Sequence, residues 1–155
     1  MSGGRSLAEP AFPDDDGTVD ARLEAVLGDR DATLAVLGDV RVFVPIVATL
    51  GEGGLTADGG DKDADMAAVL MTGADGRTAL LTFSSLATMA AWNHHARPVP
   101  VWGRAAAVAA QDEGASALLL DLGSPHFTVI ETDDLGHLAA GHRLVRTGDG
   151  TAWVA

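Results

Sequence analysis

Residues 78–102 read TALLTFSSLATMAAWNHHARPVPVW, the most distinctive stretch of the chain. The run TALLTF is apolar enough for a buried strand. Ser84 or Ser85 then supplies a helix N-cap, and the apolar residues after it predict a short helix that ends near Trp92. The Arg-Pro-Val-Pro segment beyond it disfavours helix, so it predicts a second strand that ends at Trp102.

Three predicted elements precede this stretch. Apolar residues at helical spacing between residues 20 and 37 predict one kinked helix or two short ones. Residues 40–49, VRVFVPIVAT, predict a strand that is apolar on both faces and therefore covered on both sides. Pro45 lacks an N–H, which indicates an edge strand or a bulge. The run GADG at residues 73–76 predicts a hairpin between strands at residues 65–72 and 77–83.

The remaining elements complete a mixed architecture. Residues 103–113 are rich in alanine and predict a helix, and two strands follow at residues 117–122 and 127–130. Thr132 is predicted to cap a last helix, and the chain ends in a predicted hairpin around residues 148–150. This order predicts an α/β fold of α+β-like character, in which helices pack on a mixed sheet in a single domain.

The predicted domain covers residues 19–155. Residues 1–18, MSGGRSLAEPAFPDDDGT, combine Gly, Pro, Ser and an aspartate run. Such a segment buries too little apolar surface to offset the entropy of ordering it, so it predicts a disordered tail.

Composition excludes several classes of function. The net charge is −12 and the ten basic residues do not cluster, which argues against binding to nucleic acids. The same charge disfavours anionic membranes, and no apolar run approaches the roughly 18 residues of a membrane-spanning helix. The chain has no cysteine, so disulfides and thiolate metal sites are excluded. The start of the sequence lacks signal-peptide character, and we expect a cytoplasmic protein.

With these elements in place, the chain resembles the SseB family (enhanced serine sensitivity), and specifically its N-terminal domain. The matching stretches are VRVFVPIVA, KDADMAAVLMT, TALLTFSSLATMAAW, RPVPV, the alanine-rich helix and ALLLDLGSP. The resemblance covers residues 20–145. It implies a fold and no activity, because the family is uncharacterised and has no agreed reaction or cofactor. We therefore expect no catalytic residue, cofactor or metal, and the sequence favours a non-catalytic role.

The sequence offers three possible chemical sites, and a structural explanation is favoured for each. Ser84 or Ser85 could act as a nucleophile with His94 or His95 as base and Asp121 as orienting group, but a helix cap explains the serines. The Asp-x-Asp-x-Asp run at residues 61–65 lacks the glycine and glutamate of a calcium loop. The histidines at positions 137 and 142 are five residues apart, beyond the spacing of two ligands on one helical face.

Two functions remain open at this point. The first is a protein-interaction or regulatory module, whose partner could be a second copy of the chain. The second is a small-molecule-binding domain or weak enzyme built from residues 83–85, 92–97 and 123–126, the last running from Gly123 to His126. A binding domain should have a deep pocket where these loops meet, whereas an interaction module should have a shallow apolar patch. The candidate partner or ligand surface comprises Phe83, Ser84, Ser85, Trp92, His95, Arg97, Pro98 and Trp102.

Overall fold

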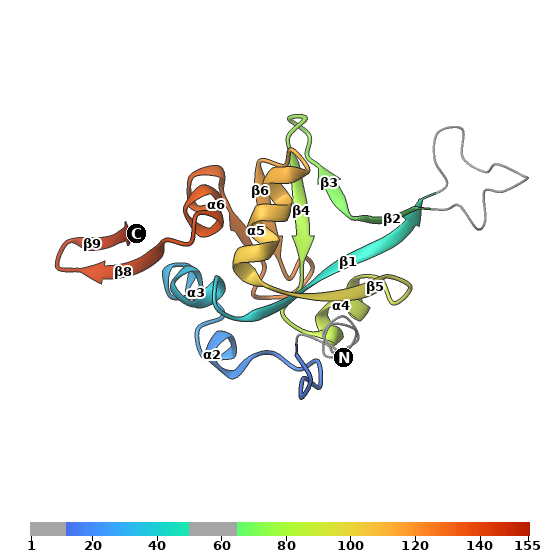
Figure 1. Cartoon of the computed structure of the whole chain (residues 1–155), viewed down its shortest axis with the longest axis horizontal. Coiled ribbons are helices and arrows are strands. Elements are labelled where there is room, and N and C mark those ends of the chain that lie inside the picture. The colour runs from blue at the N-terminus through green and yellow to red at the C-terminus, as the bar shows by residue number, and fades with distance from the viewer. Residues whose placement is uncertain (1–11, 50–64) are drawn as a thin grey trace, which may run out of the picture.

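The computed structural model describes residues 12–49 and 65–155. Of the described residues, 29% lie in helices and 33% in strands, which confirms the predicted α/β class. The helices are α2 (Ala21–Glu24), α3 (Arg30–Leu37), α4 (Leu86–Trp92), α5 (Gly103–Asp112) and α6 (Thr132–Ala139) (Figure 1). The strands are β1 (Arg41–Thr49), β2 (Asp65–Ala68), β3 (Leu70–Thr72), β4 (Thr78–Thr82), β5 (Arg97–Trp102), β6 (Ala117–Leu120), β7 (Thr128–Ile130), β8 (Arg143–Thr147) and β9 (Gly150–Val154).

Two sheets form the body of the molecule and are joined at two points. One sheet has the order β2-β1-β5 and the other β3-β4-β6-β7. Phe43 and Phe83 form an antiparallel bridge, in which each backbone N–H donates to the other's carbonyl at 2.8 Å. Val69 donates to the Pro45 carbonyl and accepts from the Leu81 N–H, both at 3.2 Å. The strand predicted at residues 65–72 is therefore two strands, one in each sheet.

Pro45 does not mark an edge strand, because β1 lies between β2 and β5. The prediction of an edge position was wrong for a local reason. Pairing with β2 begins only at Ile46, and the Phe83 bridge is made by Phe43. Pro45 falls between these two partners, where a missing N–H costs no ladder hydrogen bond.

The central strands β4 and β6 are parallel and buried on both faces. Leu80, Leu118 and Leu120 point into a core formed with α3, α5 and α6. Leu81 and Leu119 point to the opposite face, into a second core that contains Met89 of α4. Alternate residues of a strand point to opposite faces, so apolar residues at every position require cover on both sides.

Helix α5 starts directly after β5 and contacts the end of α3. A Cβ at Gly103 would lie 1.8 Å from the Leu37 carbonyl oxygen, so only glycine permits this approach. The contact places the end of β5, and with it Trp102, beside the start of β1. Arg41 and Trp102 are direct cross-strand partners.

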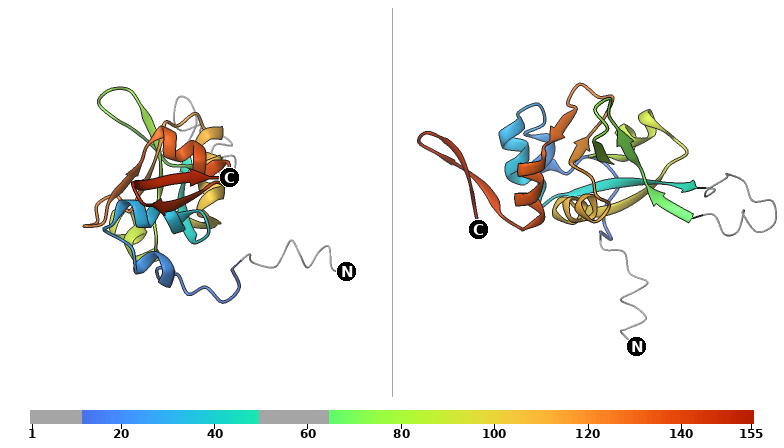
Figure 2. Two further views of the ribbon diagram at one scale, coloured as in Figure 1. Left: turned by 90° about the vertical axis from the view of Figure 1, so that its left-hand side faces the viewer. Right: turned by 90° about the horizontal axis from the view of Figure 1, so that it is seen from above.

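The last two strands form a separate hairpin, β8–β9, at the end of the molecule opposite the free ends of β1 and β2 (Figure 2). Trp153 stacks on His137 of α6, with 5.1 Å between ring centroids, and its Nε1 donates to Asp134 at 3.0 Å. Within the described residues, none of the helices is long and apolar enough to cross a membrane.

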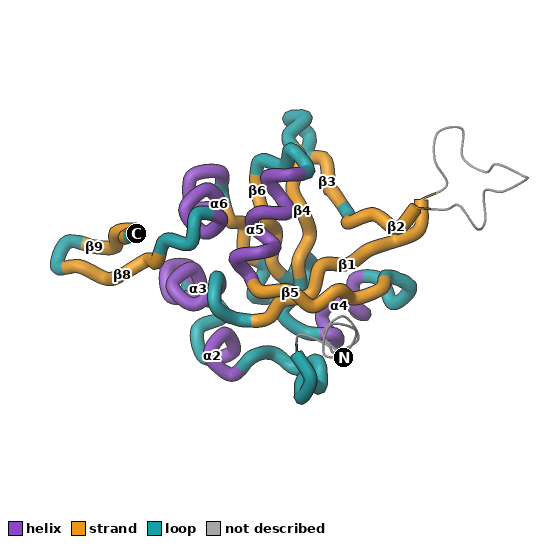
Figure 3. Tube along the Cα trace, viewed as in Figure 1, coloured by secondary structure: helices purple, strands orange, loops and turns teal. Residues whose placement is uncertain are grey.

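Residues 12–18 belong to the segment predicted as a disordered tail, and they contact the domain. They form a loop that leads into α2 (Figure 3). The Gly17 carbonyl accepts a hydrogen bond from the Leu86 N–H at 2.9 Å. We call residues 12–18 the strap. Residues 1–11 of the predicted tail lie outside the described residues, as do the first residues of the Asp-x-Asp-x-Asp run.

Candidate functional site

A fully buried carboxylate lies where the parallel strands β4 and β6 end. Asp121 follows β6, is 1% exposed and has a φ of 59°, a left-handed conformation that aspartate tolerates. It accepts hydrogen bonds from the Ser84 N–H at 2.7 Å and from the Ser84 hydroxyl at 2.6 Å. The Thr88 hydroxyl lies 3.1 Å from its Oδ1. The carboxylate thus holds the end of β4 and the start of α4 together.

A buried cation lies on the other side of Ser84. Arg41 opens β1, is 5% exposed, and donates to the Ser84 carbonyl at 2.8 Å. Its guanidinium lies 4.2 Å from the centroid of the Phe43 ring. These two contacts come from the domain itself. They fix the planar guanidinium in one orientation, with its remaining donors directed at the strap.

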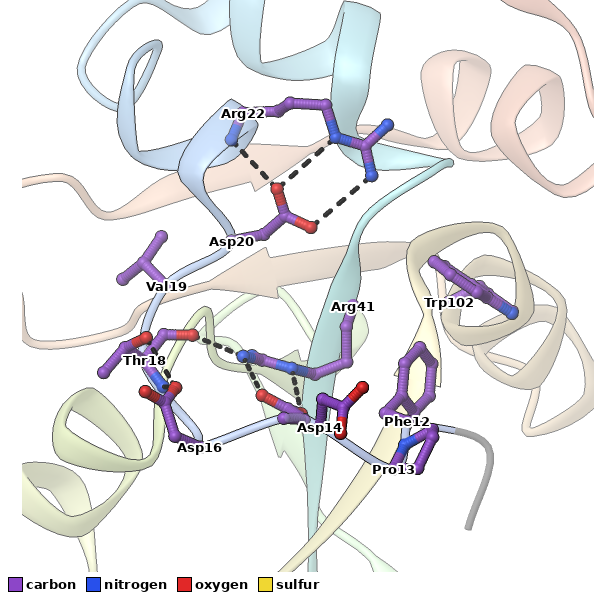
Figure 4. A pocket seen from close by; sticks show the side chains of 11 residues that line it. Phe12, Pro13, Asp14, Asp16, Thr18, Val19, Asp20, Arg22, Arg41 and Trp102 are labelled. Atoms are coloured by element: carbon purple, nitrogen blue, oxygen red, sulfur yellow. Dashed lines mark hydrogen bonds and ion pairs between the residues drawn. The ribbon is translucent and has the colours of Figure 1, made fainter. Parts of the chain in front are cut away.

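The strap supplies the counter-charge for this arginine. Asp15 accepts two hydrogen bonds from Arg41, from Nε at 2.7 Å and from Nη2 at 2.9 Å, and the Thr18 carbonyl accepts from Nη2 as well. Phe12 packs edge-on against Trp102, with ring centroids 4.7 Å apart. Figure 4 shows these side chains around a hollow of about 440 Å³ between the strap and the strands.

The acidic side chains around this hollow are bound by neighbouring donors. The backbone N–H and hydroxyl of Thr18 hold the pKa of Asp16 below its ordinary value of 3.8. Partial burial works to raise the pKa of Asp20, but hydrogen bonds from Arg22 outweigh it, so this pKa is also lowered. Both carboxylates therefore stay charged at neutral pH, and Asp20 caps α2.

One face of the β1–β5 ladder forms the floor beneath the strap. Arg41 pairs with Trp102 and Phe43 pairs with Pro100, and opposed residues of an antiparallel ladder share a face. Because the backbone of Phe43 bonds to Phe83, its partner Pro100 directs its backbone away from β1, toward the open edge. Pro98 lies two residues before Pro100, so its backbone also points toward the open edge. The edge of β5 therefore lacks N–H donors at two successive outward positions, which blocks addition of another strand.

Helix α4 exposes a face without charge. Leu86 is 38% exposed, and Ala87, Ala90 and Ala91 are exposed as well. At the end of α4, a hollow of about 450 Å³ is bounded by Trp92 and the loop that follows Asp121; its lining comprises Thr88, Ala91, Trp92, Leu122, Gly123, Ser124 and Pro125. Helix and hollow form a mostly apolar surface.

The predicted site residues fall into four groups. Phe83 and Ser84 are buried, and Ser85 is the N-cap of α4 in a capping box with Thr88. Trp92 packs on Phe83 with ring centroids 5.5 Å apart and lines the hollow at the end of α4. Pro98 lies beside the strap, and 47% of Trp102 is exposed there. His95 and Arg97 are exposed and line neither hollow.

The described geometry does not assemble a nucleophile with a base. The Ser84 hydroxyl donates to Asp121 directly, whereas His94 and His95 lie beyond α4, with their rings 4.1 Å apart. The Nδ1 atoms of His137 and His142 are 2.9 Å apart, a contact that their sequence spacing did not predict. Among residues 12–49 and 65–155, no three His, Asp or Glu side chains are grouped as a metal site.

Sequence reasoning missed Arg41 and Asp15 and weighed Asp121 only as a catalytic partner. A signal for Arg41 was present, because it is the one charge in the run VRVFVPIVA, in a strand predicted to be covered on both faces. A charge in such a strand requires a buried partner. Which of the 22 acidic residues provides it could not be read from the sequence, because 26 positions separate Asp15 and Arg41.

Comparison with known families gave one match. A family model described as SseB protein N-terminal domain matches residues 19–137 and so confirms the resemblance inferred from the sequence. The matched range includes Arg41, Ser84 and Asp121 but begins after the strap. No curated protein and no solved structure gave a match.

Proposed function

This chain belongs to the SseB family, and on that premise we propose that it is a non-catalytic protein-interaction module. The observation that carries the proposal is the solvent face of α4. This helix has no charged residue, although the protein has a net charge of −12, and it exposes Leu86 and three alanines. Uncharged, apolar surface of this kind is typical of protein–protein contacts.

The chemistry of α4 favours an amphipathic helix of a partner protein as its ligand. Exposed alanines allow a second helix to approach closely, and the hollow at Trp92 can receive one larger apolar side chain. The net charge of −12 favours a partner whose polar side is basic. Strand addition is disfavoured, because Pro98 and Pro100 remove donors from the β5 edge. We also propose a cytoplasmic location, as the composition suggests.

The test compares two matched alanines on two helices. Ala90→Glu places a charge on the exposed face of α4, and Ala105→Glu places the same charge on an exposed position of α5. Both variants should unfold at the temperature of the unmodified chain. A partner captured by the unmodified protein and by Ala105→Glu, but lost with Ala90→Glu, would support the proposal. Retention of every specific partner by Ala90→Glu would contradict it.

A second candidate is a small-molecule-binding domain that uses the hollow at Trp92. It is favoured by the position of that hollow, beside the carboxyl ends of the parallel strands β4 and β6, where α/β proteins often bind ligands. Native mass spectrometry of the purified protein distinguishes the two. A stoichiometric metabolite that is lost in Trp92→Ala, provided this variant remains folded, would place ligand binding ahead of the interaction module.

A further inference from the structure

Residues of the domain hold the guanidinium of Arg41 in place beneath the strap. The Ser84 carbonyl and the Phe43 ring orient its guanidinium from the domain side, and neither contact involves the strap. If the strap were to leave, Arg41 would keep its orientation but lose both bonds to Asp15. With the strap in place Arg41 is 5% exposed, and a buried guanidinium without a counter-charge is costly, so any segment that covers this position must supply an acceptor for it.

The strap fills the space above Arg41 incompletely. Phe12 lines a hollow of about 440 Å³ shared with Trp102 and Arg41, and another of about 300 Å³ shared with Pro98 and Pro100. Phe12 packs on a tryptophan that is still 47% exposed. A longer or bulkier segment could therefore bury more apolar surface than the strap does.

The groove and the strap that lies in it carry opposite charges. Asp14, Asp15 and Asp16 belong to the strap and would leave with it. The floor that remains consists of Arg41 with Phe43, Pro98, Pro100 and Trp102. Asp20 and Arg22 also line the larger hollow and would remain, but they pair with each other at 3.4 Å. The buried positive charge of Arg41 on this otherwise apolar floor therefore complements an aromatic, acidic segment.

We infer that the strap is an internal ligand, and that the groove beneath it binds a segment of a partner protein with an aromatic side chain three residues before a carboxylate. Phe12 and Asp15 have this spacing and mark the two subsites, Trp102 with its proline neighbours for the ring and Arg41 for the carboxylate. The inference rests on the proposed function, since it specifies a protein partner. It concerns the floor formed by β1 and β5, which meets the exposed face of α4 only at Leu86.

The experiment uses full-length chains and a peptide of residues 11–18, AFPDDDGT, as the probe. The host is the double variant Phe12→Ala/Asp15→Asn, which removes both anchors of the strap. Isothermal titration calorimetry should give binding of this peptide to the host that is at least about tenfold tighter than to the unmodified chain. The reason is that the tethered strap competes at an effective concentration in the millimolar range.

Two altered peptides test the subsites. The peptides carrying Phe12→Ala or Asp15→Asn should each bind the host about tenfold more weakly, as expected for loss of an aromatic contact or a bidentate ion pair. Equal binding of all three peptides, or no binding by a folded host at millimolar peptide, would overturn the inference. A dimer of the unmodified chain held by exchange of straps, detected by light scattering, would overturn the assignment to a separate partner.

If the double variant does not fold, the single variant Phe12→Ala replaces it as the protein that receives the peptide. Phe12→Ala alone keeps the Asp15–Arg41 ion pair and should bind the peptide several-fold better than the unmodified chain; failure to do so would count against the inference. Ala90→Glu on α4 should leave peptide binding unchanged. The peptide titration therefore tests the groove beneath the strap, and Ala90→Glu tests the face of α4. Either proposal can fail without the other.

Discussion

Arg41 and Asp121 are both buried charges that contact Ser84, but their counter-groups come from different parts of the chain. Asp121 is satisfied by Ser84 and Thr88, which belong to the junction between β4 and α4. Arg41 is satisfied largely by the strap, which has no helix or strand of its own. The Asp121 carboxylate is therefore part of the scaffold, whereas the Arg41 guanidinium could pair with an acidic segment other than the strap.

The largest effect is expected at Asp121. Asp121→Ala leaves the buried N–H and hydroxyl of Ser84 without acceptors, so the free energy of unfolding should fall by about 3–5 kcal/mol. Asp121→Asn is the matched control, because asparagine tolerates the left-handed backbone and keeps one acceptor oxygen; it should cost about 1–2 kcal/mol. Urea denaturation measures both values. Losses below about 1 kcal/mol in both variants would show that the carboxylate and its bonds do not hold this junction.

A smaller and asymmetric effect is expected at the ion pair. Asp15→Asn leaves Arg41 buried without a counter-charge and should cost about 2–3 kcal/mol. Arg41→Met should cost about 1 kcal/mol less, because methionine can pack on Phe43 while Asp15 returns to water with the strap. Urea denaturation of both variants provides the comparison. If Arg41→Met costs as much as Asp15→Asn or more, the strap does not release as we describe.

Ser84 separates the two charges and allows one side to be changed alone. Ser84→Ala removes the hydroxyl bond to Asp121 but keeps the carbonyl that accepts from Arg41. The free energy of unfolding should fall by about 2 kcal/mol, since the lost bond is to a buried charged group. Limited proteolysis within the strap, at conditions where the domain stays folded, should proceed at the rate of the unmodified protein. Faster cleavage would indicate that the two charges are coupled through Ser84.

The smallest effect is expected from acid. The pKa of Asp16 is lowered in the folded protein, so its contribution to holding the strap is fully present above the ordinary value of 3.8 and is lost as pH falls below it. The chemical shift of the Thr18 amide should therefore change below about pH 4 and stay constant from pH 5 to 8. In Thr18→Ala the midpoint of this chemical-shift titration should move toward pH 3.8, since the Asp16 carboxylate loses one hydrogen bond. An unchanged midpoint would contradict this assignment.

Local patterns predicted most elements of this fold, and the errors have definite causes. The hairpin at residues 73–76, the helix capped by Ser85 and the alanine-rich helix all depend on short-range signals. The split of residues 65–72 into β2 and β3 arises because Val69 bonds to Pro45 on one side and Leu81 on the other. Those partners lie 24 and 12 positions away in the printed sequence, so no local pattern encodes them.

The candidate site was only partly predictable for the same reason. Trp92, Pro98 and Trp102 stood out as residues that could contact a partner, and each lines one of three hollows. Asp15 did not stand out, because it lies in an aspartate run whose composition is that of a disordered tail. A single bidentate ion pair with a distant strand changes that expectation for residues 12–18, and composition carries no information about such a pair.

The amino-acid sequence by itself determined the α/β class, the apolar strands covered on both faces, the capped helix α4 and membership of the SseB family. These properties follow from side-chain periodicity, capping and turn chemistry, which act over a few residues. Only the tertiary structure decided that Asp121 anchors the β4–α4 junction and that the strap neutralises Arg41. Both depend on pairings across 37 and 26 positions, and burial selects such partners only once the strands have been brought together.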